Sequence, residues 1–154
     1  MYPTLVALHS WMRWLVLISL LFALYRAYSG WFGNKTFTRS DNTVRHTTAT
    51  ILHIQFLLGL WLYFISPLVQ TFLHNFKEGM HERQLRFFGL EHITVMLAAI
   101  VVITIGSAKA KRKRFDKQKF RTMAIWFTIG LLLVLSSIPW PFSPLISRPW
   151  VRGF

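Results

Sequence analysis

Four long apolar runs alternate with shorter polar segments along the chain, at about residues 5–25, 51–69, 87–105 and 123–138. Each approaches the roughly 20 residues that a helix needs to cross the hydrocarbon core of a bilayer, and the fourth is the shortest. The runs are apolar nearly all round, whereas the helices of a soluble bundle keep a polar stripe. The pattern therefore predicts four transmembrane helices, over about residues 5–27, 48–73, 86–108 and 122–139.

These spans predict one all-α domain over residues 1–154, an integral membrane four-helix bundle. The connections are short, so consecutive helices should pack antiparallel as neighbours. Ser40 or Asp41 is the expected cap of the second helix, and Pro67 should kink its last turns. Small residues inside the spans, such as Gly106 and Gly130, would let helices approach closely. Prolines at 139, 141, 144 and 149 predict an extended, non-helical tail over residues 139–154.

The basic residues are distributed unequally between the two sides of the predicted bundle. The chain has 18 Lys and Arg, 5 Asp and Glu, and a net charge of +13. Four basic residues lie in the first connection and eight in the third, between Lys109 and Arg121. Positively charged loops stay cytoplasmic, so both termini should face outward. The basic run would contact anionic lipid head groups, and its position between two spans argues against nucleic-acid binding.

Three histidines, His9, His53 and His92, fall inside predicted spans, where an ionisable side chain is costly without a partner. With a rise of about 1.5 Å per residue, His9 lies about 9 Å outward of the midplane and His92 about 7–8 Å outward. The first and third helices can face one another across the bundle. Two imidazoles at matching depth are what a six-coordinate haem requires, so His9 and His92 are the predicted axial ligands of one haem b.

His53 lies about 10 Å inward of the midplane by the same reckoning, and no histidine faces it at that level. It could bond a quinone oxygen, relay protons with Gln55, join a haem pair, or simply pack with its ring bonded to a neighbouring helix. That last, purely structural alternative applies to His9 and His92 as well.

Arg13 follows His9 by one helical turn and lies where a lipid-facing guanidinium would be expensive. We expect an anionic partner for it, either Glu91 or a haem propionate, unless the side chain extends outward to water. Arg83 and Arg86, at the outer edge, are further candidates for binding propionates.

The composition and one polar cluster bear on metal binding. The chain has no cysteine, which excludes disulfides, thiolate metal sites and cysteine nucleophiles. His74 and His81 lie near Glu78 and Glu82 in the predicted outer loop, where a zinc or copper site is conceivable and a solvated polar cluster is the simpler interpretation.

The strings LHSWMRWLVL, HIQFLLGLWLYFISPLVQ, RFFGLEHITVMLAAIVVITIG and the IPWP ending, in this order, cover nearly the whole chain. In these motifs and their spacing the chain resembles small bacterial four-span membrane proteins commonly labelled "cytochrome B". The resemblance implies b-type haem, membrane electron transfer and a place in the bacterial cytoplasmic membrane. It also implies functional roles for His9 in LHS, His53 in HIQ and His92 in LEH.

The sequence therefore predicts a multi-pass membrane cytochrome that carries one bis-histidine haem. It would pass electrons between a quinol pool and an outer acceptor, or serve as a subunit of a respiratory complex or as a homodimer. No acid–base, nucleophile or phosphate-binding motif points to an independent catalyst. One alternative is a non-haem accessory or assembly subunit, in which the histidines and Arg13 form interhelical hydrogen bonds. Another is a metal or proton transporter that uses His53, Gln55 and His92.

Overall fold

The computed structural model describes residues 1–144 and 146–153, and the described part of the chain is helical with no strand. The elements in chain order are α1 (Tyr2–Phe32), α2 (Arg39–Ile65), α3 (Pro67–His74), α4 (Phe76–His81), α5 (Arg83–Arg86), η1 (Phe87–Glu91), α6 (His92–Arg112) and α7 (Asp116–Ser137). η1 is a π-helical turn that joins α5 to α6 in one continuous helix. Four helices, namely α1, α2, the α5–η1–α6 helix and α7, are long and apolar enough to span a membrane. The predicted all-α, four-span fold is confirmed.

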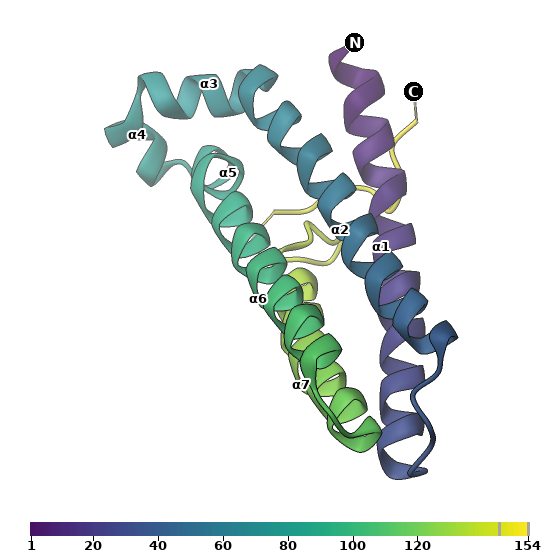
Figure 1. Cartoon of the computed structure of the whole chain (residues 1–154). Helices are drawn as coiled ribbons and strands as arrows, with labels where there is room; N and C mark the ends of the chain where they lie inside the picture. The colour runs from purple at the N-terminus through teal and green to yellow at the C-terminus, as the bar shows by residue number, and fades with distance from the viewer. Residues whose placement is uncertain (145, 154) are drawn as a thin grey trace.

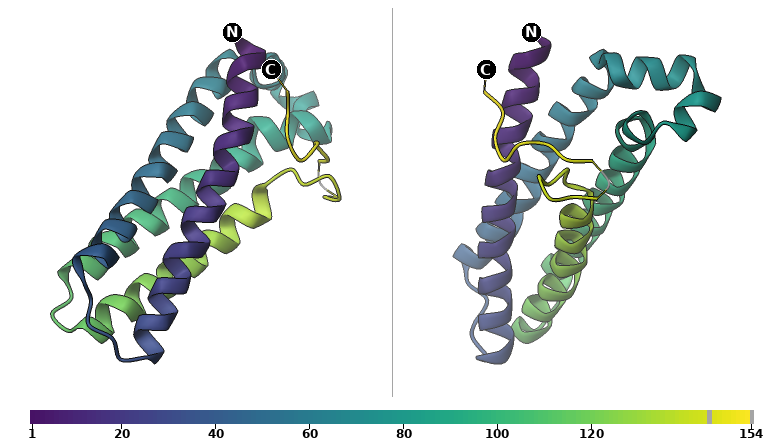
Figure 2. Two further views of the ribbon diagram at one scale, coloured as in Figure 1. Left: turned by 90° about the vertical axis from the view of Figure 1, so that its right-hand side faces the viewer. Right: turned by 180° about the vertical axis from the view of Figure 1, so that it is seen from behind.

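The four long helices form two pairs that diverge from one end. α1 packs beside α2, and α6 beside α7. The pairs meet where the α1–α2 and α6–α7 connections lie, here called the loop end, and they separate toward the end that holds both termini (Figures 1 and 2). α1 also packs on α7 and α2 on α6, so α1 and α6 lie diagonally across the bundle.

Small residues bring α6 and α7 together. A methyl group built on Gly106 would lie 2.2 Å from Cβ of Trp126, and one on Gly130 would lie 2.3 Å from Cγ1 of Ile103. Neither distance is possible for real atoms, so larger side chains at these two positions would force the helices apart. The expected close approach at these glycines is confirmed.

Polar contacts hold the loop end closed. Thr38 caps α2, and its side chain accepts from the backbone N–H of Asp41 while the Asp41 carboxylate accepts from the backbone N–H of Thr38. The expected cap at Ser40 or Asp41 is therefore wrong, because Asp41 takes the third helical position of a capping box. Asp41 also pairs with Arg26 of α1 at 2.7 Å. The buried Arg45 of α2 donates to the backbone oxygen of Ser107 in α6, at 3.1 Å.

The second predicted span, about residues 48–73, is displaced toward the C-terminus, because α2 begins at Arg39 and ends at Ile65. Ser66 has an extended backbone (ψ 124°) and Pro67 begins α3. A proline disfavours helical backbone at the preceding residue and has no N–H to continue the helix, so the chain breaks here rather than kinking. α3 then runs sideways from the end of α2, and α4 leads back to α5 (Figure 1).

The tail after α7 is non-helical over its described residues, as predicted. Leu145 and Phe154, which the predicted tail includes, lie outside the described residues. The tail turns back from the end of α7 and crosses between the two helix pairs before rising beside α1 (Figure 2). Trp150 stacks on Trp14 of α1, with ring centroids 6.1 Å apart, and it also contacts Trp140 at 5.7 Å. The tail is therefore anchored to α1 through Trp14 and Trp150.

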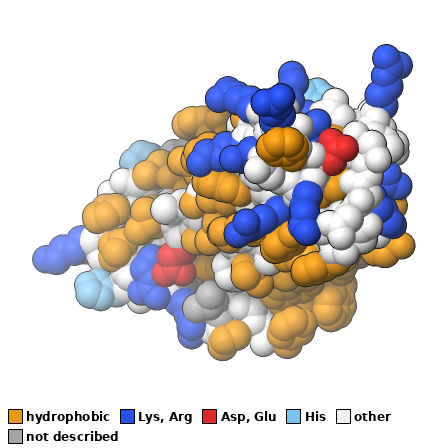
Figure 3. Space-filling model, turned by 60° about the horizontal axis from the view of Figure 1, so that its bottom comes forward, with side chains coloured by type: hydrophobic (Ala, Val, Ile, Leu, Met, Phe, Trp, Pro, Cys, Tyr) orange, Lys and Arg blue, Asp and Glu red, His pale blue; other side chains and the backbone are white. Residues whose placement is uncertain are grey.

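The loop end carries a concentration of Lys and Arg side chains among exposed apolar ones (Figure 3). The exposed basic residues there lie in and beside the α6–α7 connection, namely Arg112, Lys113, Arg114 and Lys117. The opposite end, where the two helix pairs lie apart, holds both termini and the tail (Figure 1).

Candidate functional site

A cavity of about 250 Å³ lies between the two helix pairs. α1, α2, the α5–η1–α6 helix, α7 and the tail all contribute to its lining. Most of the wall is apolar, with side chains such as Phe56, Leu60, Met96 and Ile100. The few polar lining groups gather around two histidines and at the tail.

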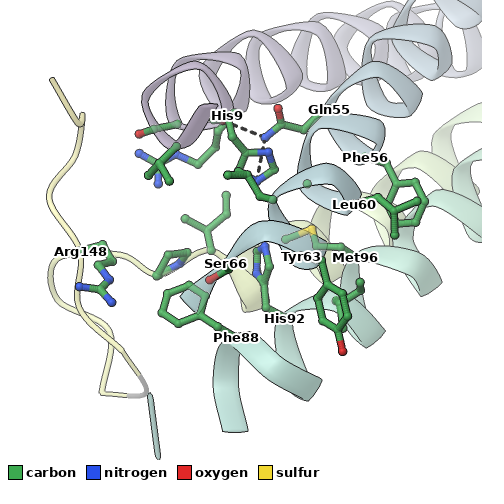
Figure 4. Close-up of a pocket in the computed structure, with 18 of the residues that line it drawn as sticks. His9, Gln55, Phe56, Leu60, Tyr63, Ser66, Phe88, His92, Met96 and Arg148 are labelled. Atoms are coloured by element: carbon green, nitrogen blue, oxygen red, sulfur yellow. Dashed lines mark hydrogen bonds between the residues drawn. The ribbon is translucent and has the colours of Figure 1, made fainter. Parts of the chain in front are cut away.

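His9 of α1 and His92 of α6 face one another across this cavity (Figure 4). Their ring centroids are 6.5 Å apart and the ring planes are inclined by 78°. The depths estimated from the sequence pair the same two residues. Because α1 and α6 lie diagonally across the bundle, the side chains of His9 and His92 can meet between the helix pairs.

The chain fixes which nitrogen of His92 is free. Its Nδ1 lies 2.8 Å from the backbone oxygen of Ser137, the last residue of α7. A carbonyl only accepts, so Nδ1 carries the hydrogen and Nε2 keeps a basic lone pair in the neutral ring. Continuing the helix would give the Ser137 carbonyl the N–H of residue 141, but that residue is proline and has none. The IPWP ending thus leaves an acceptor that His92 uses.

The π-helical turn η1 ends immediately before His92, and the sequence analysis did not foresee it. Phe87 and Phe88 of this turn pack on the His92 ring, with centroid distances of 5.7 and 6.3 Å. Isolated π turns inside helices occur frequently at functional sites because they reorient the next side chain. Here the turn and Ser137 together position one imidazole.

His9 is held by α2. Gln55 donates from its side-chain nitrogen to the backbone oxygen of His9 at 3.0 Å, and the same nitrogen lies 3.5 Å from Nε2 of the ring. Gly59, one turn further along α2, lies against the ring: a methyl group built there would be 3.0 Å from its Cε1 atom. The absence of a side chain at Gly59 lets the α2 backbone approach His9 closely.

Four buried side-chain atoms in the described part of the chain have no hydrogen-bond partner, and all four belong to residues that line this cavity. They are Nδ1 of His9, Oγ of Ser10, Nε of Arg13 and Oε1 of Gln55. Buried polar atoms are almost always paired in proteins, and the cost of leaving them unpaired is highest in an apolar medium. Their concentration at one place makes this cavity the candidate ligand site.

Arg13 contacts the tail rather than Glu91. Its Nη2 donates to the backbone oxygen of Trp150, which also accepts from Nε1 of Trp14 at 3.2 Å. Glu91 instead accepts from Nε of Arg86 at 2.7 Å. The Arg13–Glu91 alternative is therefore wrong, since η1 directs Glu91 back toward Arg86. Arg86 is also occupied and is a weak candidate for a ligand carboxylate.

Two further arginines, Arg148 and Arg152 of the tail, line the cavity, and the sequence analysis did not single them out. The Arg148 guanidinium lies over the ring of Phe88, 5.2 Å from its centroid. Burial, reinforced by the nearby charge of Arg152, holds the pKa of Arg148 below its usual range. No Asp or Glu occurs among the described lining residues.

His53 is not part of the cavity lining. Its ring is exposed, Nδ1 donates to the backbone oxygen of Ala49 at 2.6 Å, and Nε2 accepts from the Thr104 hydroxyl at 3.1 Å. Both ring nitrogens are therefore satisfied. The structure places Gln55 beside His9 instead, so the two members of the suggested proton relay are separated. His53 links α2 to α6 on the outside of the bundle.

The described residues contain no group of three or more His, Cys, Asp or Glu side chains that could hold a metal ion. The zinc or copper site considered for His74, His81, Glu78 and Glu82 is therefore not formed. His74 instead donates to the backbone oxygen of Gln70 at 2.7 Å.

No protein-family model, curated protein or solved structure matches this chain. The likeness to the "cytochrome B" proteins stays an expectation based on the motifs quoted above. The support for a function comes from the chemistry of the cavity.

Proposed function

We propose that this protein is a membrane-bound b-type cytochrome that holds one haem between His9 and His92. The observation that carries the proposal is the separation of the two imidazoles, 6.5 Å between ring centroids. Two imidazole nitrogens bound on opposite sides of one metal, each at about 2 Å, place the ring centroids about 6 Å apart. The spacing of the two ring centroids is thus compatible with a metal between the imidazoles.

The rest of the cavity fits the same ligand. A porphyrin is flat and apolar with carboxylates at one edge, and the lining combines apolar side chains with three arginines. Ser137 keeps the Nε2 of His92 available as a ligand, as carbonyl partners commonly do for metal-bound histidines. His9 has a ring nitrogen, Nδ1, that lacks any partner in the described chain.

When bound, the haem supplies one-electron reduction and oxidation at its iron. His9 and His92 would hold the group, side chains such as Phe56 and Leu60 would exclude water, and the lining arginines would balance its negative charge. A haem held by two histidines would suit electron transfer.

We further propose an orientation and a location. The basic residues of the loop end (Figure 3) favour a cytoplasmic position for that end, with both termini outside. The cavity then lies in the outer half of a bacterial cytoplasmic membrane. Electrons would pass between a quinol pool and an acceptor on the outer side, or between this chain and other subunits of a respiratory complex.

An absorption spectrum tests this proposal. Protein purified from haem-replete cells should be red, contain one haem per chain, and give a reduced-minus-oxidised spectrum of low-spin b haem. A colourless preparation that does not take up added haem would overturn the proposal and favour the accessory-subunit alternative.

A further inference from the structure

Three arginines stand at one side of the cavity, and they come from opposite ends of the chain. Arg13 belongs to α1, whereas Arg148 and Arg152 belong to the tail. Figure 4 shows Arg148 on the tail, to one side of the facing His9 and His92. The tail is anchored at this position because the backbone oxygen of Trp150 accepts from both Arg13 and Trp14.

No acidic side chain of the protein compensates these three charges. The chain has five acidic residues. Asp41 pairs with Arg26, Glu91 with Arg86 and Asp116 with Lys119. The other two, Glu78 and Glu82, are exposed on α4 and at its end, and they are not among the cavity-lining residues.

The donors of these arginines are also largely unused. Nε of Arg13 is buried and has no partner. Arg148 lies over an aromatic face, and among the described residues neither Arg148 nor Arg152 donates a hydrogen bond to a protein acceptor. Like charges gathered at an apolar cavity repel one another and lose hydration, so a bound anion would stabilise this arrangement.

We propose that Arg13, Arg148 and Arg152 bind the carboxylates of the cavity's ligand, and that the tail is part of the binding site. A guanidinium presents paired donors that match a carboxylate. This inference rests on the proposed function, in which the ligand is haem and the carboxylates are its two propionates. The ligand therefore joins the two ends of the chain, through Arg13 on α1 and through Arg148 and Arg152 on the tail.

The experiment titrates haem-free protein in detergent with haemin and with haemin dimethyl ester, in which both carboxylates are masked. The dissociation constant is measured from the Soret absorbance. Wild-type protein should bind haemin at least about tenfold more tightly than the diester, because hydrogen bonds between charged partners are lost. The Arg148→Gln/Arg152→Gln double variant should weaken haemin binding and should lose most of the preference for the free acid.

Arg83→Gln is the matched control, since Arg83 lies on the same side of the molecule but outside the cavity lining. It should keep the wild-type preference. A second readout is protection of the tail: haemin should slow proteolysis within residues 139–153 in wild-type protein more than the diester does.

The possible failures are distinguishable. If wild-type protein binds neither compound, the proposed function is wrong. If it binds haemin and the diester equally well with a low-spin spectrum, the haem proposal stands and the arginine proposal is overturned. Because the comparison of the two ligands uses wild-type protein, that result does not depend on the folding of any variant.

Discussion

The Nδ1 atom of His92 donates to the backbone oxygen of Ser137 at 2.8 Å, so the end of α7 orients a ring carried by α6. Ile138 has an extended backbone before Pro139, so α7 ends at Ser137 and no helical N–H of the next turn reaches the Ser137 carbonyl. The proline-rich ending of the chain therefore shapes the cavity in two ways. It exposes an acceptor for His92, and it starts the tail that places Arg148 and Arg152 at the same cavity.

Gly59 should control the position of His9. Gly59→Leu would place a bulky side chain where even a methyl group lies 3.0 Å from Cε1 of His9. We expect the imidazole to be displaced and haem occupancy, measured as the ratio of Soret to protein absorbance, to fall at least severalfold. Leu57→Ala, at an exposed position on the same helix, is the control and should keep full occupancy. Unchanged occupancy in Gly59→Leu would show that the close approach of α2 is not needed.

Arg45 should stabilise the loop end without affecting the cavity. Arg45→Met removes the donor to Ser107 and leaves buried acceptors without a partner. We expect a loss of about 1–3 kcal/mol of stability, seen as a lower Tm in detergent, with an unchanged haem spectrum. Arg112→Met, an exposed position near the same end, should leave the Tm within experimental error. An equal effect of the two substitutions would contradict the role given to Arg45.

The capping box of α2 gives a test of local structure. Thr38→Ala should cost about 1 kcal/mol, because the side-chain acceptor for the Asp41 N–H is lost. Ser40→Ala should change the stability little, since no hydrogen bond of the Ser40 side chain is described. Thermal unfolding of both variants measures the two losses of stability. A larger loss in Ser40→Ala than in Thr38→Ala would show that Thr38 is not the cap of α2.

The sequence alone predicted the features that depend on length and depth. Apolar runs of about 20 residues marked the four spans, and the rise per residue placed His9 and His92 at similar depths. The structure puts these two rings 6.5 Å apart. This success has a simple cause: a helix is rigid, so counting residues along it measures distance through the bilayer.

Features that depend on backbone groups and irregular segments could not be predicted in this way. The partner of Arg13 is the backbone oxygen of Trp150. Every residue has a backbone oxygen, so the sequence does not indicate this contact. The roles of Arg148 and Arg152 depend on the path of a tail without periodicity. The π turn before His92 and the complete break at Ser66–Pro67 are likewise local departures from a regular helix. Of these irregular features, only the one at Pro67 was indicated by the sequence, and it was predicted as a kink in the helix and not as a break.

The most direct test of the central claim is the visible spectrum of three single variants, His9→Ala, His92→Ala and His53→Ala, purified in parallel from haem-replete cells. The first two should each lose the low-spin reduced-minus-oxidised spectrum, because each removes one of the two facing imidazoles. His53→Ala should keep it, because that ring lies outside the cavity with both nitrogens bonded within the protein. A low-spin spectrum that survives in His9→Ala or His92→Ala, or that disappears in His53→Ala, would contradict the assignment of the haem to this cavity.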